Sequence, residues 1–79
     1  MHQPTNFSDI AELFSKLSDR EQQVVTLVCN GLSDKEIADK LGVTEGTIKI
    51  HLHAIYEKLN IHSRTKLAIA LITGRSKSA

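Results

Sequence analysis

Histidines, one cysteine and closely spaced carboxylates are the side chains of this 79-residue chain that could bind a metal ion or transfer protons. His51 and His53 lie two positions apart, which on a helix would point their rings about 160° away from each other. Cys29 is the single cysteine, so neither a disulfide within the chain nor a zinc site with paired cysteines can form. We interpret these residues as polar histidines and a core thiol, and we predict no metal site.

Catalytic chemistry has equally little support. The sequence holds no glycine-rich phosphate loop, and no serine or cysteine stands in a recognisable nucleophile setting. Asp34, Glu36 and Asp39 form a small carboxylate group, but Glu36 fits a capping box with Ser33, and Asp34 fits the preference for negative charge at a helix N-terminus. We therefore predict no enzyme, no catalytic residues, no cofactor and no small-molecule ligand in this domain.

The charged side chains are distributed unevenly, although the net charge is only +1. Residues 1–45 carry four basic and eight acidic side chains, whereas residues 46–79 carry six basic side chains and one acidic side chain. This asymmetry predicts a domain with one face that attracts anions. The chain has only three aromatic residues, which argues against a stacking surface for single-stranded nucleic acid.

The spacing of apolar residues predicts four helices, and no alternating strand pattern of useful length occurs. The predicted helices cover about 19–29, 34–41, 45–59 and 64–73. Their predicted N-caps are Ser18, which fits a capping box with Glu21, then Ser33, Thr44 and Ser63. Their predicted ends are Gly31, Gly42, Asn60 and Gly74. The expected fold class is all-α, a four-helix bundle-like domain that contains a helix-turn-helix.

The pattern divides the chain into three parts. Residues 1–16 hold Ile10, Leu13 and Phe14 at helical spacing and are expected to form an N-terminal linker or a weak extra helix. Residues 17–74 form the domain, and residues 75–79 are expected to be a flexible tail. No apolar run reaches transmembrane length and no signal-peptide pattern is present, so we expect a cytoplasmic, nucleoid-associated protein without a membrane partner.

The second and third predicted helices are joined by a short turn at Gly42, as in a helix-turn-helix. In the third helix, an inner stripe is formed by Ile48, Leu52, Ile55 and Leu59. The opposite side carries Ile50 and His53, with Lys49 on its flank. An apolar Ile50 on this outward side could pack on a thymine methyl in the major groove, although scattered exposed apolar residues are also normal on protein surfaces.

Four segments of the chain make this pattern specific: LSDRE, GLSDKEIADKLGV, TIKIHL and IYEKLNIHSR. With them, residues 17–68 resemble the LuxR/FixJ (GerE-type) DNA-binding domain, as in NarL-type response regulators. The resemblance implies a four-helix fold, promoter binding as a dimer and a recognition helix at 45–59. By position it implies base reading by Lys49, Ile50 and His53, and phosphate contacts from Thr47, His51, Lys58 and Arg64. At the position of His53, other members often carry lysine, serine or arginine.

The fourth predicted helix is apolar all round, from Leu67 to Ile72. Leu67, Ala70 and Leu71 can share its inner face. The outer face then holds Thr65, Ala68, Ile69 and Ile72, which we predict to form a homodimer interface. The alternative is that residues 1–16 fold back over this face through Leu13 and Phe14.

Taken as a whole, the sequence predicts a bacterial transcription regulator that binds double-stranded promoter DNA specifically, as a homodimer, with RNA polymerase as a further candidate partner. The alternative is a helix-turn-helix protein-interaction module that does not bind DNA. Titration with random duplex DNA at low salt distinguishes the two.

Overall fold

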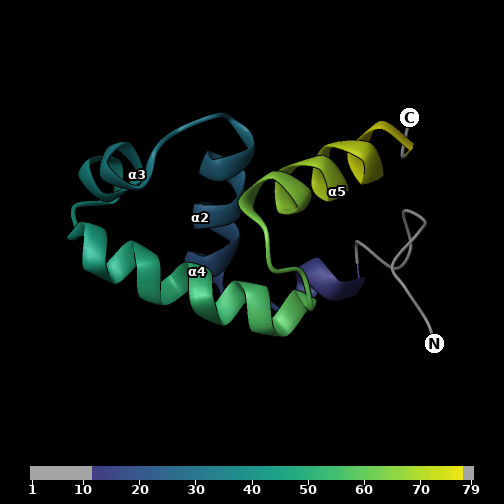
Figure 1. Ribbon diagram of the computed structural model, residues 1–79, viewed down its shortest axis with the longest axis horizontal. Coiled ribbons are helices and arrows are strands. Elements are labelled where there is room, and N and C mark those ends of the chain that lie inside the picture. Colours follow the sequence, from purple (N-terminus) through teal and green to yellow (C-terminus); the bar gives the residue numbers. More distant parts are fainter. Residues whose placement is uncertain (1–11, 78–79) are drawn as a thin grey trace.

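The computed structural model describes residues 12–77, with side chains to residue 72, and this part of the chain is helical without strands (Figure 1). A helical turn at 12–15 precedes the helices of the domain. These are α2 (Asp19–Cys29), α3 (Asp34–Leu41), α4 (Glu45–Leu59) and α5 (Arg64–Lys77). The predicted all-α fold class is confirmed.

Two helices begin at capping boxes, as the sequence predicts. Ser18 Oγ accepts from the Glu21 N–H at 3.1 Å, and the Glu21 carboxylate accepts from the Ser18 N–H at 2.9 Å. Ser33 and Glu36 repeat the arrangement at the start of α3, at 3.2 and 2.8 Å. Each box satisfies two backbone donors that would otherwise lack partners, which fixes where the helix starts.

The helix ends follow the predicted residues with one exception. Gly31, Gly42 and Asn60 have positive φ angles of 87°, 72° and 56°, so each turns the chain out of its helix in the left-handed conformation. The prediction that the last helix stops at Gly74 is wrong, because α5 continues to Lys77. A glycine inside a helix costs about 1 kcal/mol but keeps its N–H donor, and no proline follows to force an end.

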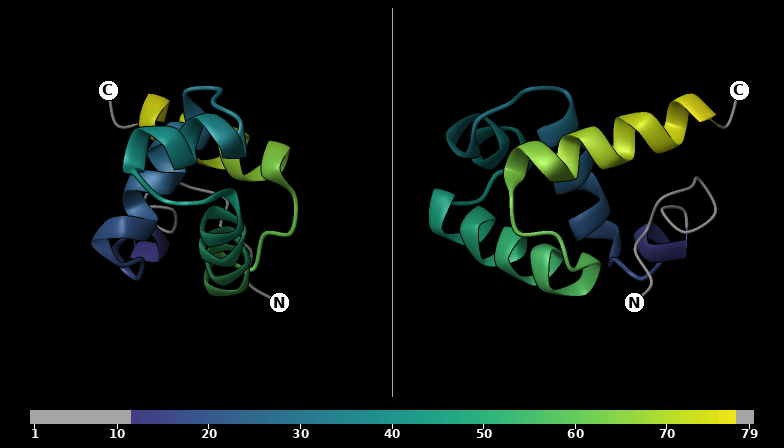
Figure 2. Two further views of the ribbon diagram at one scale, coloured as in Figure 1. Left: turned by 90° about the vertical axis from the view of Figure 1, so that its left-hand side faces the viewer. Right: turned by 45° about the vertical axis from the view of Figure 1, so that its right-hand side comes forward.

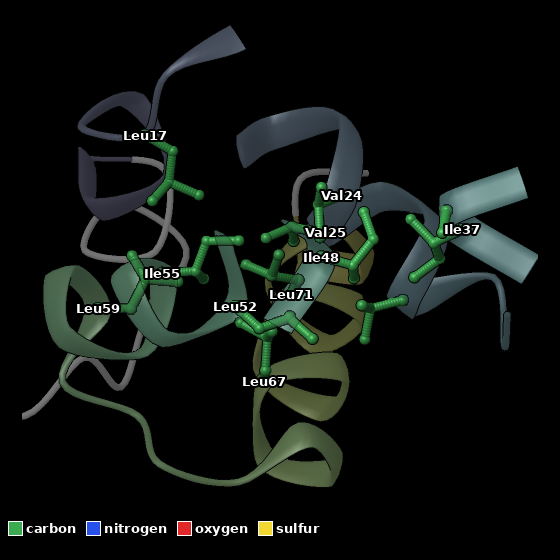
Figure 3. Packing of buried hydrophobic residues seen from close by; sticks show 12 residues of the cluster. Leu17, Val24, Val25, Ile37, Ile48, Leu52, Ile55, Leu59, Leu67 and Leu71 are labelled. Atoms are coloured by element: carbon green, nitrogen blue, oxygen red, sulfur yellow. The ribbon is translucent and has the colours of Figure 1, made fainter. Parts of the chain in front are cut away.

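The core is aliphatic and is centred on α2, which contacts α3, α4 and α5 (Figure 1). Val24 and Val25 of α2 are fully buried. Figure 3 shows them between the inner side chains of the neighbouring helices, which include Ile37, Ile48, Leu52, Ile55, Leu59, Leu67 and Leu71. The predicted inner stripe of α4 is therefore confirmed, and so is the inward position of Leu67 and Leu71 in α5. Ala70 is half-buried.

The segment before α2 adds a small extension to this core. Leu13 and Phe14 pack against the core cluster, and Leu17 is buried. The Gln22 side-chain amide on α2 donates to the Phe14 and Leu17 carbonyls, both at 3.2 Å. Leu13 and Phe14 do not cover the outer side of α5, where large side chains remain exposed. The rest of the predicted N-terminal part, including Ile10, lies outside the described residues.

Candidate nucleic-acid interface

The turn between α3 and α4 consists of three residues, Gly42, Val43 and Thr44. Gly42 takes the left-handed conformation, and the Val43 N–H then donates to the Ala38 carbonyl at 3.0 Å. Thr44 Oγ1 accepts from the Thr47 N–H at 3.2 Å and so caps α4. These local bonds fix the direction in which α4 leaves the turn, which is the geometric requirement of a helix-turn-helix.

The three predicted base-reading residues are exposed together on α4. Ile50 is 71% exposed, the Lys49 side chain is 64% exposed, and His53 is also exposed. The inner stripe of the same helix faces α2, so its other side is turned to solvent, and α4 lies along one edge of the molecule (Figures 1 and 2). The fold therefore presents this side of α4 without obstruction by the described residues.

Thr47 and His51 lie half-buried beside the exposed side of α4. Thr47 Oγ1 is 3.0 Å from Thr44 Oγ1, so the two hydroxyls share a hydrogen bond at the start of the helix. Hydroxyls and backbone N–H groups at a helix N-terminus are suitable donors for a phosphate oxygen. Their positions are compatible with the predicted phosphate contacts.

Lys58, another predicted phosphate contact, is engaged within the domain. Its Nζ donates to Glu21 Oε1 at 2.7 Å and joins the last turn of α4 to the first turn of α2. The Glu21 side chain is only 8% exposed, whereas that of Lys58 is 42% exposed. Lys58 thus compensates a buried charge on one side and remains open to solvent on the other.

Arg64, the fourth predicted phosphate contact, is also held by internal acceptors. Its Nη1 donates to Asp34 Oδ1 and its Nη2 to the Leu32 carbonyl, both at 2.6 Å. Lys49 Nζ donates to the second oxygen of the same carboxylate, Asp34 Oδ2, at 3.2 Å. Asp34 therefore links the starts of α3, α4 and α5 through charge.

The two carboxylates at these contacts have lowered pKa values. Burial by itself would raise the pKa of Glu21, but hydrogen bonds from Lys58 and Ser18 and the Lys58 charge lower it below the ordinary 4.5. For Asp34, burial is likewise outweighed by hydrogen bonds from Arg64 and Lys49, which hold its pKa below the ordinary 3.8. Both groups therefore stay ionised at neutral pH.

The sequence does not reveal the long-range partners of Glu21 and Asp34. From the sequence, each residue was explained by its place at a helix start, and the structure confirms this local role for Glu21. Their second partners lie 37 and 30 positions away along the chain. No periodic pattern connects residues at such separations. The only available signal was that Glu21 and Asp34 lie in the acidic half of the chain, whereas Lys58 and Arg64 lie in the basic half.

The predicted dimer face of α5 is open in the monomer. Ile69 is 57% exposed and Ile72 is 48% exposed. Thr65 is exposed and Ala68 is half-buried. These four residues form what we call the outer face of α5.

Between residues 12 and 77, no three His, Cys, Asp or Glu side chains gather in a way that could hold a metal ion. None of the helices described there has the length and apolar character needed to cross a bilayer.

Comparison with known proteins identifies the family. Residues 15–71 match the family described as "Bacterial regulatory proteins, luxR family". This chain belongs to the LuxR family. It is 46% identical over 59 residues to "Two-component response regulator PprB" of Pseudomonas aeruginosa, a match that covers 75% of this chain and 22% of that protein. It is 39% identical over 62 residues to "Nitrate/nitrite response regulator protein NarP" of Escherichia coli, covering 78% of this chain and 29% of that protein.

A solved structure shows the same fold. The chain matches the one described as "Low Resolution Structure of Response Regulator StyR" with 42% identity and a TM-score of 0.76, over 84% of this chain and 33% of that one. The chain therefore spans a third or less of the length of these three proteins. It is the helix-turn-helix domain of a transcription regulator and not an enzyme, and the predicted family resemblance is confirmed.

Proposed function

We propose that this LuxR-family domain binds duplex DNA sequence-specifically by placing the first half of α4 in the major groove. The observation that carries the proposal is the joint exposure of Lys49, Ile50 and His53 on the second helix of the helix-turn-helix. An ammonium, an apolar side chain and an imidazole can meet a base acceptor, a thymine methyl and a further base edge or phosphate. Docking of this kind needs an exposed N-terminal half and a buried inner stripe, and α4 has both.

Affinity in this mode comes mainly from phosphate contacts. Thr47 and His51 flank the exposed side of α4, and the half-exposed ammonium of Lys58 keeps donors directed to solvent. Arg64 has five N–H donors, of which the two internal bonds occupy two. We propose that these four residues contact the DNA backbone and that they set the position of α4 rather than its sequence preference.

We further propose that two copies pair through the outer face of α5 when they are bound to DNA. Ile69 and Ile72 form an exposed apolar pair, a feature typical of an interaction surface. One helix pair buries little area, so the contact is weak in free solution. Two half-sites on one duplex supply the effective concentration that a weak contact needs.

The function is tested by titrating random duplex and a selected preferred duplex at low and moderate salt. We expect binding of random duplex that weakens as salt rises, because phosphate contacts release counterions. Lys49→Ala should cost about 1–3 kcal/mol on the preferred site and much less on random DNA. Lys16→Ala, which removes an exposed lysine from the turn before α2, is the matched control and should affect neither strongly.

Two results would count against this function. A folded domain that does not bind random duplex at low salt would favour the alternative, an interaction module without DNA binding. An equal loss on both duplexes for Lys49→Ala would assign Lys49 to a phosphate and remove it from base reading.

A further inference from the structure

Asp34 of α3 forms ion pairs with basic side chains from two other helices, α4 and α5. It is the first residue of α3, and its two oxygens accept from Arg64 of α5 at 2.6 Å and from Lys49 of α4 at 3.2 Å. The Asp34 side chain is 20% exposed, whereas the Lys49 side chain is 64% exposed. The carboxylate is therefore fixed within the fold, and the ammonium lies at the surface, where another anion can replace its partner.

The two cations depend on this carboxylate to different degrees. Arg64 has a second acceptor in the Leu32 carbonyl at 2.6 Å, so it stays anchored when Asp34 loses its charge. Among the residues that the structure describes, the other acidic partner of Lys49 is Glu45, at 4.0 Å. Neutralising Asp34 therefore releases Lys49 much more than it releases Arg64.

We propose that Asp34 is a positioning residue that holds Lys49 back from DNA of the wrong sequence, an inference that rests on the proposed function. Breaking the Lys49–Asp34 pair costs the same on every duplex. On the preferred site a base acceptor replaces the carboxylate and offsets that cost. On random duplex no such acceptor is in place, so Lys49 stays with Asp34 and contributes little. Asp34 in this way keeps Lys49 from adding to non-specific affinity, at the cost of weaker binding to the preferred site.

The test is Asp34→Asn, which keeps the size of the side chain and an oxygen acceptor for Arg64. We expect affinity for random duplex to rise about 2–5-fold, the range of an exposed ion pair. The salt dependence on random duplex should become steeper by up to about 0.9 unit, because Lys49 is then free to displace a counterion. Affinity for the preferred site should rise at least as much, because Lys49 then reaches its base acceptor without breaking the pair, so the specificity ratio should not fall.

The matched control is Asp39→Asn, on the same helix. Asp39 is exposed and forms no ion pair within the described part of the chain, so this variant changes the net charge by the same amount without touching Lys49. Repeating Asp34→Asn in a Lys49→Ala background, a double-mutant cycle, tests whether Asp34 acts through Lys49. There we expect Asp34→Asn to behave like Asp39→Asn.

The inference is overturned if Asp34→Asn and Asp39→Asn have equal effects, or if the effect of Asp34→Asn persists without Lys49. Either result assigns the effect to charge alone or to Arg64. These outcomes differ from failure of the proposed function, in which the unsubstituted domain itself does not bind duplex DNA.

A measurement on the unsubstituted protein keeps the inference testable if Asp34→Asn does not fold by circular dichroism. Brief labelling with an amine-acylating reagent, read by mass spectrometry, compares Lys49 with Lys35, an exposed lysine of α3. We expect Lys49 to react more slowly than Lys35, and to approach the rate of Lys35 in folded Asp34→Asn. Equal rates in the unsubstituted protein would show that Asp34 does not restrain the ammonium.

Discussion

Helices α4 and α5 both present isoleucine to solvent, but in different surroundings. Ile50 of α4 is 71% exposed and stands between Lys49 and His51, with His53 less than one turn further on. Ile69 and Ile72 of α5 are 57% and 48% exposed and lie three positions apart, so they are neighbours on one side of the helix. One exposed isoleucine thus has an ammonium and imidazoles as neighbours, whereas the other two have each other.

The difference shows that the role of an exposed apolar residue is best inferred from the side chains beside it. A single isoleucine among cationic or hydrogen-bonding groups fits a base pair, which offers a methyl group next to polar edges. Two isoleucines three positions apart on one side of a helix fit a second copy of the same surface, because a two-fold contact places like against like. We therefore expect substitutions on the two helices to affect different properties.

The largest expected effect comes from Ile69→Glu on α5. A charge at the centre of an apolar two-fold contact faces its own copy, so pairing should be lost. We expect cooperative filling of two half-sites on one duplex to disappear, while binding to one half-site changes less than about 2-fold. Binding isotherms on duplexes with one and with two half-sites measure this.

Circular dichroism is the folding control for Ile69→Glu. A folded variant that still fills both half-sites cooperatively would place the dimer contact elsewhere. An unfolded variant would show that Ile69 supports the core, contrary to its exposure in the structure.

The reciprocal substitution, Ile50→Glu on α4, should weaken binding to a single half-site by at least about tenfold, because a carboxylate is placed against the phosphates and base edges of the groove. Cooperativity between half-sites should remain. Ile69→Glu on the same single half-site is the matched control, since it introduces the same charge on the other helix. Equal losses from both variants would mean that the two faces do not have separate roles.

Lys58 joins α4 to α2, so Lys58→Met tests how firmly α4 is held. Removing the ammonium leaves the buried Glu21 carboxylate without its charged partner, so we expect the free energy of unfolding at pH 7 to fall by about 1–3 kcal/mol. Urea denaturation measures it, and Lys66→Met, at an exposed position of α5, is the control. If Lys58 also contacts a phosphate, as proposed, the plot of log DNA affinity against log salt concentration should flatten by about 0.9 unit in this variant.

The pH dependence of Lys58→Met follows from the lowered pKa of Glu21. A carboxyl with a lowered folded-state pKa adds stability above its ordinary value, 4.5, and this stability is lost as the pH falls through the folded-state pKa. Without Lys58 the pKa of Glu21 rises. When the pH is lowered from 5, the free energy of unfolding of Lys58→Met should therefore fall less than that of the unsubstituted protein. An unchanged acid transition would mean that the pair does not stabilise the fold.

The smallest expected effect is that of Gly46→Ala, at the second residue of α4. An added Cβ would have Thr44 Oγ1 as its nearest neighbour, at 3.8 Å, which is an ordinary contact. We expect stability to rise by about 0.4–1 kcal/mol, because the unfolded chain loses freedom. If this end of α4 lies close to DNA, affinity should fall at the same time. A gain in both properties would place Gly46 away from the duplex.

Features that depend on neighbouring residues were predictable from the sequence. Ser18 with Glu21 and Ser33 with Glu36 form their capping boxes as expected, and Gly42 and Asn60 end their helices in the left-handed conformation. Such signals act within one turn, where the spacing of residue types determines which atoms can meet. The inner stripe of α4 was predictable for the same reason, since its period is that of the helix.

Features that depend on the packing of distant segments were not predictable. Lys58 and Arg64 were expected to face phosphates, and nothing in the sequence indicated that each also binds an internal acceptor 37 or 30 positions away. Gly74 has the residue type of a helix end, yet α5 passes through it, because a glycine costs a helix only about 1 kcal/mol and no proline follows. Exposure of the proposed DNA-reading residues was predictable; which of them are tied to carboxylates was not.

The separation between the buried stripe of α4 and its solvent side has an evolutionary consequence. Ile50 and His53 are exposed and form no ion pair or side-chain hydrogen bond within residues 12–72, so exchanging them should alter the free energy of unfolding by no more than about 0.5 kcal/mol. Lys49 is different, because Asp34 constrains it. If Ile50 and His53 read bases as proposed, a gene copy acquires a new operator through two codons, 50 and 53, without compensating changes in the core. Within such a lineage, we expect these two positions to diverge first, with 49 and 34 changing together.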